Sequence, residues 1–85
     1  MHARYIASMP PPIKLPFSGK KLRSVRERRG LTQQDLAEVT RLSQWQLSRF
    51  ENGHTVPTVT VFRALLLALE CEPGDLLDED QAGAA

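Results

Sequence analysis

Apolar residues recur every three or four positions through most of the chain, in segments separated by polar residues, glycines and prolines. This spacing is typical of amphipathic helices. Five helices are expected on this basis, at about residues 19–29, 33–39, 44–52, 59–70 and 73–78. The fourth has the widest apolar stripe, formed by Phe62, Leu65, Leu66 and Leu69. The pattern therefore predicts an all-α fold.

The segment 31–53, LTQQDLAEVTRLSQWQLSRFENG, contains two helix starts that are built in the same way. Thr32 precedes the first helix and Asp35 follows three residues later, which is the arrangement of a capping box. Ser43 and Gln46 repeat this arrangement at the second helix. Two short capped helices joined by a turn of about four residues are typical of a helix-turn-helix.

The second of these helices, at about 44–52, has Leu47 and Phe50 as its core-facing positions. At about 100° per residue, Trp45, Ser48, Arg49 and Asn52 are expected to point away from that core, with Gln44 and Gln46 on the flanks. A glutamine can pair with adenine, and an arginine with guanine, through two hydrogen bonds each. An exposed tryptophan generally marks a surface that becomes covered, although it could also fold sideways against the preceding helix.

Charge is divided unevenly along the chain. Residues 1–50 contain ten Lys and Arg against three Asp and Glu, whereas residues 51–85 contain one against seven. A basic half beside an acidic half suits a protein that docks one face on a polyanion. Charge alone fits two unrelated solvated surfaces equally well.

Length and composition exclude several classes of protein. Eighty-five residues form one small domain, and a single cysteine allows no internal disulfide, which suits the cytoplasm. No apolar run is long enough for a membrane span, and the N-terminus lacks a secretory signal. The chain contains no nucleophile–base pair, no metal-ligand spacing and no phosphate-cradling glycine loop. We therefore expect neither an enzyme nor a cofactor or metal site.

The chain divides into three parts. Residues 1–17 hold four of the six prolines and predict a flexible Pro-rich N-terminal arm. This arm could contact DNA or a protein partner, and an unstructured leader fits as well. We expect residues 18–78 to form the helical domain and residues 79–85 to form an acidic, flexible C-terminal tail.

From about Lys20 to Leu77, the chain resembles the lambda-repressor-like family, the Cro/Xre type of helix-turn-helix regulator. The likeness is carried by RERRGLTQQDLA, LSQWQLSRFENG, PTVTVFRALLLAL and the final DLL. It implies a compact five-helix DNA-binding domain of bacterial, phage or plasmid type. It also implies a homodimer that represses from a palindromic operator in double-stranded DNA. Arg41 departs from the family pattern, because glycine is common in this turn and a positive φ would strain an arginine.

The resemblance, together with the charge, chemistry and apolarity of the residues, predicts functional positions along the chain. Base reading in the major groove falls to Gln44, Trp45 and Arg49. Expected contacts to the DNA backbone are made by Gln33, Ser43, Ser48 and Asn52, and by Lys20, Lys21 and Arg23 of the first helix. In the family, the glutamine that Gln33 matches also braces the recognition helix. The expected dimer contacts are Leu66, Leu67, Leu76 and Leu77.

Two alternatives to a dimeric repressor stay open. An antitoxin-type regulator would use the same fold and also bind a toxin, with the N-terminal arm as the contact. A protein-interaction adapter would use the fold without DNA. The charge division and the outward Gln44, Trp45 and Arg49 argue against the adapter.

Overall fold

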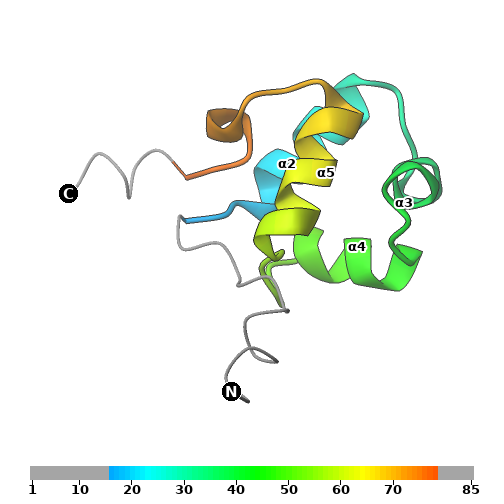
Figure 1. The fold of residues 1–85 in the computed structure, drawn as a ribbon, viewed down its shortest axis with the longest axis horizontal. Coiled ribbons are helices and arrows are strands. Elements are labelled where there is room, and N and C mark those ends of the chain that lie inside the picture. Colours follow the sequence, from blue (N-terminus) through cyan, green and yellow to red (C-terminus); the bar gives the residue numbers. More distant parts are fainter. Residues whose placement is uncertain (1–15, 79–85) are drawn as a thin grey trace, which may run out of the picture.

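The computed structural model describes residues 16–78, which fold into four α-helices and one turn of 3-10 helix (Figure 1). In chain order these are α2 (Gly19–Arg28), α3 (Gln33–Thr40), α4 (Gln44–Glu51), α5 (Val59–Leu69) and η1 (Pro73–Asp75). The four α-helices begin and end within one or two residues of their expected bounds. The N-terminal arm before Pro16 and the acidic tail lie outside the described residues. No helix of the described part is long and apolar enough to cross a membrane.

The expected fifth α-helix is wrong, because only Pro73–Asp75 is helical and it is a 3-10 turn. After this turn the backbone does not continue as a helix. It pairs through hydrogen bonds with the segment that precedes α2. Ser18 donates its N–H to the carbonyl of Leu76, and Asp78 donates to the carbonyl of Pro16, both at 2.8 Å. Phe17 and Leu77 thus form an isolated antiparallel bridge.

The helix starts follow the caps that the sequence predicts. Thr32 and Asp35 form a capping box at α3, and Ser43 and Gln46 form one at α4. Ser18 and Thr58 accept hydrogen bonds from the third backbone N–H of α2 and α5 respectively. These short-range contacts satisfy N–H groups that have no partner within the helix.

The core lies between the four α-helices, with α4 packed against α2 and α3, and α3 packed against α5. Its buried apolar side chains are Leu22, Val25, Leu36, Ala37, Leu47, Phe50, Phe62, Leu65, Leu69 and Leu76. Phe17 packs against this core, with its ring centre 6.5 Å from that of Phe50 and 6.2 Å from that of Phe62. Phe17 therefore contributes to the packing of the domain.

Arg41, in the turn between α3 and α4, has φ 63° and ψ 27°, which is the left-handed region. This conformation disfavours any residue with a Cβ atom. We expect Arg41→Gly to raise the free energy of unfolding by about 1 kcal/mol, as measured by urea denaturation. Arg41→Ala is the control, since it removes the same charge but keeps the Cβ atom. An equal gain in both variants would assign the effect to charge and contradict the prediction.

Candidate nucleic-acid interface

Helix α4 holds Leu47 and Phe50 in the core and turns its opposite face outward. Trp45 lies on the outward face and is 69% exposed, so its ring does not pack into the interior. Arg49 follows one turn later, and its Cζ lies 5.0 Å from the centre of the Trp45 ring, within cation–π range. Gln44 is exposed in the first turn. The three side chains expected to read bases therefore all reach the surface of one helix.

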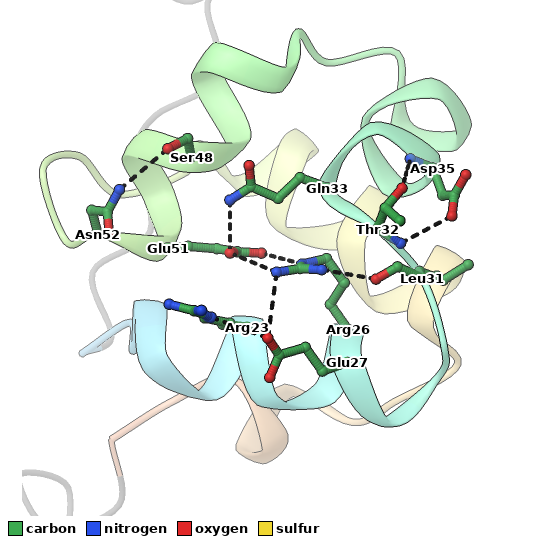
Figure 2. A network of polar contacts seen from close by, with 10 residues as sticks. All are labelled: Arg23, Arg26, Glu27, Leu31, Thr32, Gln33, Asp35, Ser48, Glu51 and Asn52. Atoms are coloured by element: carbon green, nitrogen blue, oxygen red, sulfur yellow. Dashed lines mark hydrogen bonds and ion pairs between the residues drawn. The ribbon is translucent and has the colours of Figure 1, made fainter.

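Polar pairs lie at both ends of α4. At its start, the Ser43 Oγ accepts the backbone N–H of Gln46, while the Gln46 Oε1 accepts the backbone N–H of Ser43, both at 3.0 Å. At its end, the Asn52 Nδ2 donates to the Ser48 Oγ at 3.2 Å (Figure 2). The Ser43 oxygen is thus used by the cap, and its hydroxyl hydrogen stays available to a ligand.

A buried ion pair between Arg26 of α2 and Glu51 of α4 lies beneath this surface (Figure 2). The Arg26 Nε donates to the Glu51 Oε2 at 2.6 Å, and the Arg26 Nη2 donates to the Glu51 Oε1 at 3.1 Å. The Arg26 Nη1 donates to the carbonyl of Leu31 at 2.8 Å. The Gln33 Nε2 donates to the Glu51 Oε1 at 3.0 Å. One ion pair therefore joins α2, the turn after it, α3 and α4.

Every polar group of this network is satisfied, since no buried side-chain nitrogen or oxygen among residues 16–78 lacks a hydrogen bond. The hydrogen bond to Glu51 raises the pKa of Arg26 above its ordinary value, so the guanidinium stays charged. Gln33 contacts α4 through Glu51, which is the bracing contact that the family resemblance implies for this position. Its second amide hydrogen remains available to a phosphate.

Sequence reasoning missed the Arg26–Glu51 pair, although a signal for it is present. Arg26 lies four residues after the buried Leu22, and Glu51 lies four residues after the buried Leu47, so each charge lies within the apolar stripe of its helix. Neither charge is stable alone in an apolar interior. One cation and one anion in two facing apolar stripes therefore indicate a buried pair.

The three cations of α2 that were expected at the DNA backbone lie on two different flanks. Lys20 and Arg23 line a hollow at the end of α4, together with Asn52 and the acidic residues Glu51 and Asp78. Lys21 lies on the other flank, where its Nζ donates to the carbonyl of Leu77 at 2.5 Å. The structure thus brings Lys20 and Arg23 to the end of α4 and holds Lys21 at the C-terminal segment.

The four leucines expected at a dimer contact differ in exposure. Leu67 is 69% exposed, and Leu66 and Leu77 are half-buried. Leu76 is fully buried, so its expected place in a dimer contact is wrong. The hydrogen bond from Ser18 to the Leu76 carbonyl fixes this segment against α2, and the side chain fills the core of its own chain.

Comparisons with known proteins agree with this geometry. Residues 22–76 match the family model HTH_3, described as helix-turn-helix. The restriction-modification controller protein C.AhdI from Aeromonas hydrophila is 30% identical, with a TM-score of 0.66 over 69% of this chain and 89% of that chain. The clp gene regulator ClgR from C. glutamicum is 33% identical, with a TM-score of 0.66 over 79% of this chain and 87% of that chain. No curated protein sequence matches the chain.

A further similar structure is that of the P22 c2 repressor in complex with synthetic operator 9T. It is 30% identical, with a TM-score of 0.66 over 71% of this chain and 91% of that chain. The segment that matches the family model contains the capped helices α3 and α4 and the ion pair between Arg26 of α2 and Glu51 of α4. The chain therefore belongs to the lambda-repressor-like, Cro/C1-type family of helix-turn-helix DNA-binding transcription regulators.

Proposed function

We propose that this protein is a sequence-specific repressor that acts in the cytoplasm and binds double-stranded DNA through α4 in the major groove. The proposal rests mainly on the outward face of α4, where Gln44, Trp45 and Arg49 lie above a buried ion pair. The major groove admits an α-helix, and these residue types can bind base edges there. The similar P22 c2 repressor was solved on a synthetic operator, which supports the same mode of binding here.

In this proposal, polar groups around α4 fix its position on the DNA backbone. Gln33 and Ser43 lie at the starts of the two capped helices, where backbone N–H groups and the helix dipole favour a phosphate. Ser48 and Asn52 lie at the end of α4, beside the hollow lined by Lys20 and Arg23. In this proposal, these groups contact phosphates of the second DNA strand.

The function is tested by selecting bound sequences from a random DNA pool and measuring the salt dependence of binding. We expect Lys20→Ala to weaken binding to all sequences alike and to reduce the log–log salt slope by about 0.9 per subunit. Arg23 is less suitable for this test, because its Nε pairs with the Glu27 Oε2 at 3.2 Å.

Lys21→Ala is the matched control for Lys20→Ala. It removes the same charge from the other flank, where the Leu77 carbonyl binds the ammonium group, so the salt slope should stay as in the wild type. Equal slopes for both variants would contradict the proposed orientation on DNA. A wild-type protein that selects no sequence and binds without salt dependence would favour an adapter that uses the fold without DNA.

We further propose that two copies pair through the exposed face of α5 on a palindromic operator. Val59 and Leu67 are 48% and 69% exposed, and with Arg63 they form a stripe of residues spaced four apart. Arg63 precedes Leu67 by one turn, and Glu70 follows it by nearly one turn. Antiparallel pairing about Leu67 would set each Arg63 near Glu70 of the partner subunit, as a two-fold interface requires.

We expect Leu67→Glu to yield a monomer at concentrations where the wild type sediments as a dimer. Binding to a full palindrome should then fall by roughly 100-fold, because the two half-sites are no longer bound by linked subunits. Ser24→Glu, which adds the same charge on α2, should leave both properties unchanged. A wild type that stays monomeric with and without DNA would contradict the dimer.

A further inference from the structure

Arg49 is held differently from the arginines that are hydrogen-bonded within the domain. Arg23 and Arg26 donate to carboxylates, and Arg29 donates to the carbonyls of Leu69 and Glu70. Within residues 16–78, the guanidinium of Arg49 has neither a hydrogen-bond acceptor nor an acidic partner, and its Cζ lies 5.0 Å from the centre of the Trp45 ring. The ring is therefore its contact within the domain.

This contact leaves the N–H donors of Arg49 without hydrogen-bond acceptors. A cation–π contact binds the face of the guanidinium, whereas its five N–H donors lie in the plane. No acidic side chain lines the shallow groove beside the pair, which is formed by Trp45, Gln46, Arg49, Phe50 and Thr55. No carboxylate in that groove competes with a ligand for the donors.

The contact with Trp45 also favours binding, because it holds the Arg49 side chain in place before a ligand arrives. A free arginine loses rotamer freedom when it binds a ligand, and an arginine that already lies against a ring loses less. Trp45 is itself 69% exposed, so the core does not depend on it. Its large ring on an outward face is better explained by what it does for Arg49 than by packing.

We infer that Trp45 is a positioning residue for Arg49, and that the two side chains together read one guanine in each half-site. The inference rests on the proposed function and adds the base that the pair selects. Guanine presents O6 and N7 to the major groove, and this pair of acceptors matches two N–H groups of a guanidinium. A phosphate would also accept these donors, but a phosphate contact carries no sequence discrimination.

The test uses the selected operator and copies in which single guanines are replaced by 7-deazaguanine, which lacks only the N7 acceptor. The wild type should lose about tenfold in affinity at one guanine per half-site. Arg49→Ala should remove this penalty. Trp45→Ala should reduce it to twofold or less, and Trp45→Phe, which retains an aromatic face, should keep most of it. Thermal unfolding of each variant checks that the fold is retained.

Two results would overturn the inference while leaving the proposed function intact. In one, Trp45→Ala weakens binding but keeps the full 7-deazaguanine penalty, so that Arg49 reads guanine without help. In the other, Trp45→Ala relaxes the preference at a different base pair, so that the ring contacts that base itself. A wild type that selects no sequence would overturn the proposed function, and the inference with it.

Discussion

Arg26→Met should destabilise the domain by about 3–5 kcal/mol, because it leaves the carboxylate of Glu51 buried without its cation. The side chain of Glu51 is 2% exposed and accepts two hydrogen bonds from Arg26, so solvent cannot replace the lost partner. A domain of this size has a total stability of only about 4–13 kcal/mol. Urea denaturation followed by circular dichroism should therefore show a large fall in the unfolding midpoint.

The double variant Arg26→Met with Glu51→Leu is the informative control. It replaces both charges by apolar groups of similar size, and replacements of this kind are often neutral or stabilising. Recovery of most of the lost stability would locate the cost in the unpaired charge. If the double variant were as unstable as the single one, the bonds to Leu31 and Gln33 would be the important contacts, and the explanation through burial of charge would be wrong.

Gly19→Ala should cost about 3 kcal/mol of stability, at the upper end of the usual effect of overpacking. A Cβ atom at Gly19 would lie 2.3 Å from the carbonyl oxygen of Phe50 and 2.6 Å from that of Glu51. Both neighbours are backbone atoms, so relief requires α2 and the end of α4 to move apart. Chemical denaturation of the purified variant measures the loss.

Whether Gly19→Ala lowers or raises the stability of the domain decides whether the helices α2 and α4 are in close contact there. In an uncrowded helix, replacing glycine by alanine stabilises by about 0.5–1 kcal/mol. Lys20→Ala, at the next and exposed position of α2, should change stability by less than about 0.5 kcal/mol. A stabilising Gly19→Ala would show that α2 and α4 have room to separate and would contradict the predicted clash.

The helices could be predicted from the sequence because their determinants are local. A capping box such as that of Thr32 and Asp35 depends on residues three apart. The 3-10 turn at Pro73–Asp75 and the burial of Leu76 could not be predicted in this way. Both depend on backbone pairing with residues 16–18, which lie almost 60 positions away in the sequence.

The candidate interface likewise contains some features that local sequence determines and others that depend on residues far apart in the chain. The exposure of Trp45 and Gln44 follows from the angle between successive residues of a helix and agrees with the structure. The place of Lys21 does not follow from any local rule, because its partner is the carbonyl of Leu77. The contact between Trp45 and Arg49 could have been anticipated, since residues four apart on a helix are neighbours.

The bridge between Phe17 and Leu77 makes the described chain almost a closed ring. In Figure 1, the blue start and the orange end meet on the side of the molecule opposite α3. Domains whose ends lie together tolerate circular permutation and insertion into other proteins. A short linker between Pro16 and Asp78 would close the ring, and the loop at 53–58 offers a place for new ends. A protein fused directly at Pro16 or at Asp78 would be attached on that same side of the domain, away from α3.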